Sequence, residues 1–454
     1  MKKTHVFASC VLLSLFFVVG TSANAGISDW ELKSVSDVDD NPKLVNFIWE
    51  TLRPPYGALD KVTLHRVVKK SKMFFNRKVI FMIPGTWNAG SWSELTNPDI
   101  NPMLYLANNG YDVYTMDFRS LNVPDMDYDQ FSEYGIDISS TTDWTYGVFR
   151  EDIKCCVDFI KKSSSVKKIF MSGFSRGVTH MTIYASKYQD DLRGLVALDG
   201  LTKDMPPSGT PWDEATYNQV VNLFKAGLLV DPDTSTVIPW LYMAWFLDDV
   251  NYNNWKLAGV LPYSKNLVGG ALPAGFDVIS DYVGDSAHHL WDLIGVGEGA
   301  LTNYHGGYID RDVLVDVLNE FSRYYPYIQT LEDLQLMAHE DVPYFDYDDN
   351  DIYLPMIGFV SKVGCPNYIC LIDVIPNITL SDDVTINFLQ GYGHMDVLFG
   401  TYSLTDVKQP LLVWLNAHMD EGSSQALSWQ SPGHQLLDSF LKSVIKPFFQ
   451  IEEN

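Results

Sequence analysis

The sequence predicts an α/β fold with a doubly wound, mostly parallel sheet that a large helical segment interrupts. From Leu59 onward, apolar runs of strand length alternate with amphipathic runs of helix length. This alternation is typical of a parallel sheet with helices on its faces. Residues 201–345 lack it and contain helix-like clusters instead. The alternation returns at residue 352, which indicates that the same sheet continues after the insertion.

Each predicted strand is a short run rich in apolar residues that ends near turn-forming residues. The run RKVIFMIPG is nearly continuous in apolar character, as expected for a strand buried on both faces of a sheet. The predicted strands occupy 59–68, 77–85, 110–120, 167–171, 192–200, 352–361 and the start of 384–400. The predicted core helices occupy 101–109, 150–162, 178–189 and 406–419.

The first residues predict an export signal. Lys2 and Lys3 give a positive start, an apolar stretch follows, and Ala23-Asn24-Ala25 forms a small-x-small cleavage site. The apolar stretch is shorter than the ~20 residues that span a bilayer. We therefore expect a periplasmic or secreted protein without a stable membrane anchor.

The chain divides into four predicted segments. They are an export signal at 1–25, the first part of the α/β core at 26–200, a helical insertion at 201–345, and the second part of the core with C-terminal helices at 346–454. With 46% hydrophobic and 13% aromatic residues, a chain of this length can bury a large core.

Charge and cysteine content limit the function classes. A formal net charge of -25 disfavours nucleic acid and anionic lipid headgroups as partners. Cys155 and Cys156 lie in a helical pattern and are predicted to be buried thiols, whereas Cys365 and Cys370 flank a short loop that an oxidising compartment could close. Neither pair has further ligands at the spacing of a metal site, so no metal is predicted.

The segment KKIFMSGFSRGVTH carries the strongest functional signal. Gly173-Phe174-Ser175-Arg176-Gly177 matches the pattern G-x-S-x-G between an apolar strand and a helix. In that setting a sharp turn exposes the serine hydroxyl, and small neighbours tolerate the strained backbone. Ser175 is therefore the predicted nucleophile, and the N–H of Arg176 at the helix start is a predicted oxyanion donor.

A serine nucleophile needs a base, and His394 is the best candidate. It follows a strand in GYGHMDVLFG, where a doubly wound sheet brings a side chain to the edge that carries Ser175. His180, on the nucleophile helix, and His418, in a C-terminal helix, have no such strand-end position.

These segments resemble the α/β-hydrolase superfamily, and within it the lipase and esterase branch. The resemblance rests on PGTWNAGSW, GYDVYTMDFRS, GFSRG, LVALDG and GYGHMDVLFG, and it extends over about Leu59 to Met419. It implies the α/β-hydrolase fold, with the insertion as a cap. It also implies a second oxyanion donor after the early strand, the N–H of Thr86 or of Trp87.

The position of the catalytic acid departs from the usual family pattern. In most members it follows the strand before that of the histidine, but here Gly364 stands about where an aspartate is expected. Asp199 ends the strand after the nucleophile helix, where a minority of the family, including pancreatic-type lipases, places the acid. We expect Asp199 to be the acid, with Asp373 in the later loop as the alternative.

The expected activity is ester hydrolysis through an acyl-enzyme, which requires no cofactor. The aromatic and aliphatic insertion favours a small-molecule hydrophobic ester or lipid as substrate. Amide, lactone or acyltransferase chemistry uses the same groups and stays open. So does a non-catalytic binding protein on a hydrolase scaffold.

Overall fold

The computed structural model describes most of the predicted core. The described residues are 29–38, 41–74, 76–85, 90, 100–124, 128–200, 260–262, 313, 324–326, 328–329, 332, 335, 351–361, 379–389, 392 and 395–419. The predicted export signal, nearly all of the insertion, and Cys365 and Cys370 lie outside them. Among these residues no helix has both the length and the apolar character needed to cross a bilayer.

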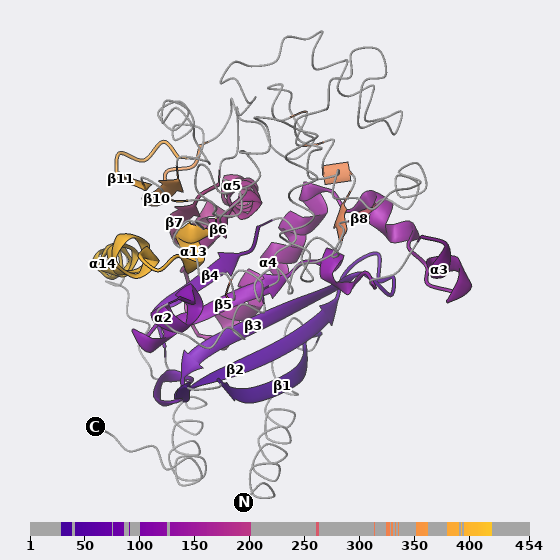
Figure 1. Cartoon of the computed structure of the whole chain (residues 1–454), viewed down its shortest axis with the longest axis horizontal. Helices are drawn as coiled ribbons and strands as arrows, with labels where there is room; N and C mark the ends of the chain where they lie inside the picture. Colours follow the sequence, from indigo (N-terminus) through magenta and orange to yellow (C-terminus); the bar gives the residue numbers. More distant parts are fainter. Residues whose placement is uncertain are drawn as a thin grey trace, which may run out of the picture.

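A nine-stranded sheet runs through the described residues (Figure 1). Its strands, in spatial order, are β1 (Glu31–Val38), β2 (Asn41–Leu52), β3 (Lys61–Lys69), β5 (Asp112–Asp117), β4 (Val79–Ile83), β6 (Ile169–Phe174), β7 (Leu192–Leu198), β10 (Met356–Ser361) and β11 (Val384–Leu389). Neighbouring strands are antiparallel from β1 to β5 and parallel from β5 to β11. The predicted mostly parallel sheet is confirmed.

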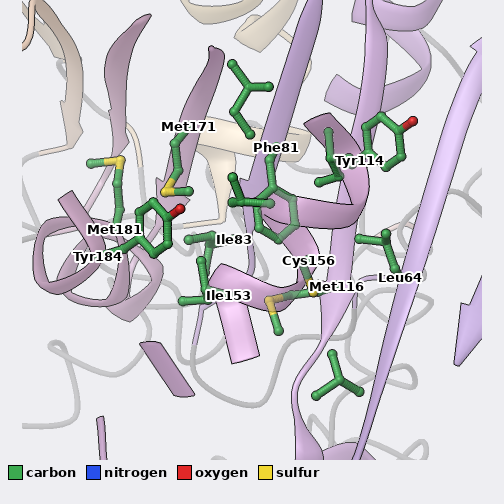
Figure 2. Packing of buried hydrophobic residues seen from close by; sticks show 14 of the residues in the cluster. Leu64, Phe81, Ile83, Tyr114, Met116, Ile153, Cys156, Met171, Met181 and Tyr184 are labelled. Carbon is green, nitrogen blue, oxygen red and sulfur yellow. The ribbon is translucent and has the colours of Figure 1, made fainter. Parts of the chain in front are cut away.

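Helices cover both faces of this sheet, as a doubly wound fold requires. The helices of the described residues are α2 (Pro102–Asn108), α3 (Tyr128–Glu133), α4 (Tyr146–Ser163), α5 (Arg176–Tyr188), α13 (Asp396–Phe399) and α14 (Gln409–Ala417), with the 3-10 helices η1 (Lys70–Lys72), η3 (Arg119–Asn122), η4 (Ser139–Asp143) and η5 (Gln189–Asp191) and the π-helix η9 (Leu404–Lys408). One buried cluster joins the sheet to α4 and α5, and a second joins it to α2 and α14. Figure 2 shows the first, with Ile153 and Cys156 of α4 and Met181 and Tyr184 of α5 among its members.

Helix α4 begins at a polar cap and buries its apolar side. The Thr145 side chain accepts the N–H of Val148, which satisfies one of the free donors of the first turn. Cys155 and Cys156 are free thiols on this helix, half-buried and buried respectively. Burial raises the pKa of the Cys155 thiol and holds that of Cys156 well above its ordinary value. The prediction of buried thiols is confirmed for Cys156, and Cys155 differs in being half-buried.

Two strand pairs lie where the sequence predicted none. The hairpin of β1 and β2 extends the antiparallel edge before Leu59. Within the insertion, the three-residue strands β8 (Val260–Pro262) and β9 (Tyr324–Pro326) form a small antiparallel sheet. Residues 201–345 are thus not purely helical. Strands of three residues are too short to show a periodic pattern in a sequence.

The register of the parallel strands brings their carboxyl ends together. Gly173 of β6 pairs with Ala197 of β7, and Phe359 of β10 pairs with Leu198. In β11, Leu389 pairs with Ser361 at the end of β10. The carboxyl ends of β6, β7, β10 and β11 therefore form one edge, which is where doubly wound sheets place their ligand sites.

Candidate functional site

Ser175 lies on a strained turn between β6 and α5. Its backbone has φ 54° and ψ −126°, a region that L-residues rarely occupy and that costs about 1–3 kcal/mol. The Ser175 N–H donates to the Leu198 carbonyl at 2.9 Å, which fixes the turn to the end of β7. The side chain makes no capping hydrogen bond to α5. The predicted strand–turn–helix setting of the serine is confirmed.

The two glycines of the motif are required by close backbone approach. A Cβ on Gly173 would lie 2.3 Å from the Gly177 carbonyl oxygen, and one on Gly177 would lie 2.4 Å from that of Ile83. Real Cβ atoms do not approach backbone this closely, so a larger side chain at either position would push α5 away from β4 and β6. The glycines thus keep the serine turn tight against the sheet.

The segment after β4 begins directly beside the serine. A Cβ on Gly85 would lie 2.9 Å from the Ser175 Cβ and 3.0 Å from the Phe174 carbonyl oxygen, so the Gly85 backbone lies close against the serine turn. Arg176 begins α5, where N-terminal N–H groups and the helix dipole favour a negative charge. Thr86 and Trp87, the alternative positions for the second donor, lie outside the described residues. Thr86 and Trp87 directly follow Gly85, which lies beside Ser175.

Asp199 stands at the end of β7 with its carboxylate fixed. The residue is 2% exposed, and its backbone N–H donates to the Phe359 carbonyl at 2.8 Å. Ser361 donates to both oxygens, from its N–H to Oδ1 and from its Oγ to Oδ2, each at 2.7 Å. A buried carboxylate needs such donors, because desolvation without them is expensive. Asp199 therefore has one defined orientation.

Ser361 is the site residue that the sequence did not indicate. Ser361 is fully buried at the tip of β10. Gly364, the position at which the family pattern would place a carboxylate, follows three residues later. The hydroxyl at this tip instead donates to the carboxylate of the neighbouring strand. The one signal in the sequence is a polar residue that closes the apolar run MIGFVS.

Comparisons with known proteins agree with the fold. A family model described as the alpha/beta hydrolase fold matches residues 79–227. A provisionally assigned lipase of Sulfolobus solfataricus superposes with a TM-score of 0.56 at 24% identity, covering 86% of this chain and 99% of that one. The chain has the α/β-hydrolase fold. A soluble variant of monoglyceride lipase from Saccharomyces cerevisiae is a more distant match, with a TM-score of 0.45 at 13% identity, covering 79% of this chain and 92% of that one. Among curated proteins there is no significant match.

In this hydrolase fold, His394 and Asp373 lie outside the described residues, so their predicted roles stay predictions. The described residues on either side of His394, Tyr392 and Met395, are both buried. They follow β11, which ends in register with Ser361.

The described histidines are held in other roles. His180 is buried among the rings of Phe118, Tyr146 and Phe149, with centroids 4.6, 4.8 and 5.7 Å away. Burial, aided by the positive charge of Arg176, holds its pKa well below the ordinary value, so it packs as a neutral ring.

His418 stacks on Trp414 at 4.1 Å and pairs with Asp383 at 2.9 Å. Asp383 precedes β11, so this histidine lies at the opposite end of the sheet from Asp199. Within the described ranges, no group of three acidic, histidine or cysteine side chains could hold a metal ion.

Proposed function

We propose that the protein is an exported serine hydrolase that cleaves carboxylic esters through an acyl-enzyme. In this mechanism His394 takes the proton of the Ser175 hydroxyl while Oγ attacks the ester carbonyl carbon. The N–H groups of Arg176 and Thr86 stabilise the resulting oxyanion. The alcohol leaves with the proton from His394, and a water molecule repeats the sequence to release the acid. Asp199 holds the imidazole in the required tautomer.

The backbone strain at Ser175 is the observation that carries this proposal. A non-glycine residue with φ 54° and ψ −126° persists only where the surroundings force it, and such strain clusters at functional sites. The turn is enforced by a hydrogen bond to Leu198 and by the backbone approach at Gly85. A buried, oriented carboxylate at Asp199 lies one strand away. A structural turn alone would explain neither the strain nor the carboxylate.

Support for a hydrophobic acyl group comes from composition. The insertion at 201–345 is rich in tryptophan, tyrosine, phenylalanine and leucine, and the family carries its cap at this place in the chain. A site covered by such residues would favour an apolar acyl chain over a charged substrate. The export signal proposed at residues 1–25 would deliver the enzyme to esters outside the cytoplasm.

Hydrolysis of p-nitrophenyl esters tests the proposal. Ser175→Ala should abolish turnover, while Ser172→Ala, on the strand that leads into the serine turn, should leave it intact. Ser172 is a matched control because its buried Oγ has no hydrogen-bond partner among the described residues. An acyl series from acetate to long chains should show kcat/KM rising with chain length. Equal activity of Ser175→Ala and wild type would refute the nucleophile assignment.

A further inference from the structure

Three consecutive residues at the end of β7 enclose the backbone of Ser175. On one side, the Leu198 carbonyl accepts the Ser175 N–H at 2.9 Å. On the other side, Gly200 lies against the Ser175 carbonyl group, since a Cβ on Gly200 would come within 2.0 Å of its oxygen and 2.8 Å of its carbon. Real Cβ atoms do not approach backbone this closely, so this arrangement requires glycine at position 200. The segment 198–200 therefore contacts the serine on both its N–H and its carbonyl side.

The residue between these two contacts, Asp199, is strained as Ser175 is. Its φ of 44° lies in the left-handed region, which residues other than glycine rarely adopt. Among the described residues, four non-glycine residues have a positive φ, and Ser175 and Asp199 are two of them. Strained conformations persist only where the surroundings enforce them. Because the two strained turns are in direct contact through Gly200, each restricts the movement of the other.

The segment 198–200 is itself fixed from the side of β10. The Asp199 N–H donates to the Phe359 carbonyl at 2.8 Å, and Ser361 donates to both oxygens of the Asp199 carboxylate. β7 lies between β6 and β10 in the sheet. The segment therefore connects the serine turn on one side to the tip of β10 on the other.

We infer that Gly200 is a positioning residue for the nucleophile, because it lets the segment 198–200 close on Ser175 and hold its strained backbone. The inference rests on the proposed function, in which Ser175 is the nucleophile. The backbone of Ser175 sets the direction of its Cβ and thereby the position of Oγ. Displacement of a reacting group by about 1 Å is enough to lower a rate by about 10². These backbone contacts are distinct from the role proposed for the Asp199 carboxylate.

Four variants of the full chain test the inference. Gly200→Ala places a methyl group against both the Ser175 carbonyl and the side chain of Val178, whose Cγ2 lies 2.4 Å from the position of that methyl group. Val178→Ala removes this side-chain contact, so the double variant retains only the collision with Ser175. Gly358→Ala on β10 is the matched control, because its Cβ would collide only with the end of the flexible Ile386 side chain, at 2.7 Å.

Hydrolysis of a p-nitrophenyl ester gives the first readout. In Gly200→Ala, kcat should fall at least about tenfold while KM changes by less than about threefold. Val178→Ala and Gly358→Ala should stay within about threefold of wild type in kcat. The double variant should retain the loss of Gly200→Ala, because the collision with the Ser175 carbonyl is still present. Unchanged kcat in Gly200→Ala, or recovery of kcat in the double variant, overturns the inference.

Hydrogen exchange of the Ser175 amide gives a second readout that does not depend on turnover. Exchange reports the local opening of a hydrogen-bonded amide, and this N–H is bonded to Leu198. In wild type it should exchange about as slowly as the amides in the middle of β6, and Gly200→Ala should accelerate it at least about tenfold without accelerating those amides. Rapid exchange at Ser175 in wild type overturns the inference without any variant. So does a loss of kcat without faster exchange at Ser175, because the loss would then come from Asp199.

The proposed function and the role of Gly200 fail separately. A wild-type protein that neither hydrolyses esters nor reacts with a fluorophosphonate contradicts the proposed function itself. A wild-type protein that does both, with a Gly200→Ala variant that matches it in kcat, contradicts only the role of Gly200. If Gly200→Ala does not fold, the double variant with Val178→Ala and the exchange of the wild-type Ser175 amide decide the question.

Discussion

Replacing Asp199 by asparagine should separate its role in catalysis from its role in the fold. In the variant, the amide oxygen can still accept the Ser361 N–H. The Ser361 hydroxyl can turn to accept a hydrogen bond from the new amide group, since a hydroxyl both donates and accepts. Two charge-assisted hydrogen bonds become neutral ones, at a cost of about 1–2 kcal/mol in the free energy of unfolding. The folded structure should therefore survive.

Catalysis should respond far more strongly than stability. In the proposed triad, an asparagine at position 199 would stabilise the wrong tautomer of the His394 imidazole, so that it could not accept the serine proton, and kcat should fall by about 10⁴. That factor corresponds to about 5 kcal/mol in the activation free energy. The assay is kcat on a p-nitrophenyl ester, with circular dichroism to confirm folding and Asp373→Asn as the comparison. A folded Asp199→Asn variant with near-full kcat would refute the assignment, and loss in Asp373→Asn instead would move the acid to the later loop.

Substitutions at three further positions probe Asp199 and the buried core. Ser361→Ala removes one of the two donors that Ser361 provides to Asp199, the proposed acid, and should lower kcat by about tenfold while KM stays constant, because the remaining N–H still holds Oδ1. His180→Phe should be more stable than wild type by about 2 kcal/mol at pH 5 and similar at pH 8, measured by urea unfolding. The folded pKa of this buried histidine is depressed, so the unfolded chain binds the extra proton as the pH falls below about 6.5, and wild-type stability declines there. Glu332→Ala should lower stability by about 1–2 kcal/mol, since its carboxylate accepts the Tyr146 N–H at 2.7 Å in the first turn of α4, and Glu332→Gln should recover part of that loss in thermal denaturation.

Local patterns were sufficient to predict the central strands and the serine turn. β4 and β6 are fully buried runs flanked by helices, and such runs combine hydrophobicity, length and turn residues in one short stretch. Ser175 was predictable because the residues that shape its turn are adjacent in the chain. Its strain, and the backbone contacts at Gly173 and Gly177, are consequences of that same stretch.

Features created by distant residues were not predictable in this way. β1 is an edge strand with most of its residues exposed or half-buried, so its sequence ELKSVSDV carries little hydrophobic signal. Ser361 gains its role only because β10 lies beside β7, which brings together two residues that are 162 positions apart in the sequence. The contact of Asp117 with Gly90 and His65 likewise joins three separate segments. A single sequence does not record such pairings.

Reaction with a fluorophosphonate, followed by peptide mass spectrometry, tests the central claim most directly. The reagent forms a stable bond with a serine only when a base and an oxyanion site activate its hydroxyl. We predict one adduct per chain, on the peptide that contains Ser175, and no adduct in Ser175→Ala or His394→Ala. Folded wild-type protein that remains unlabelled, or that carries the adduct on another serine, would contradict the assignment of Ser175 as the nucleophile.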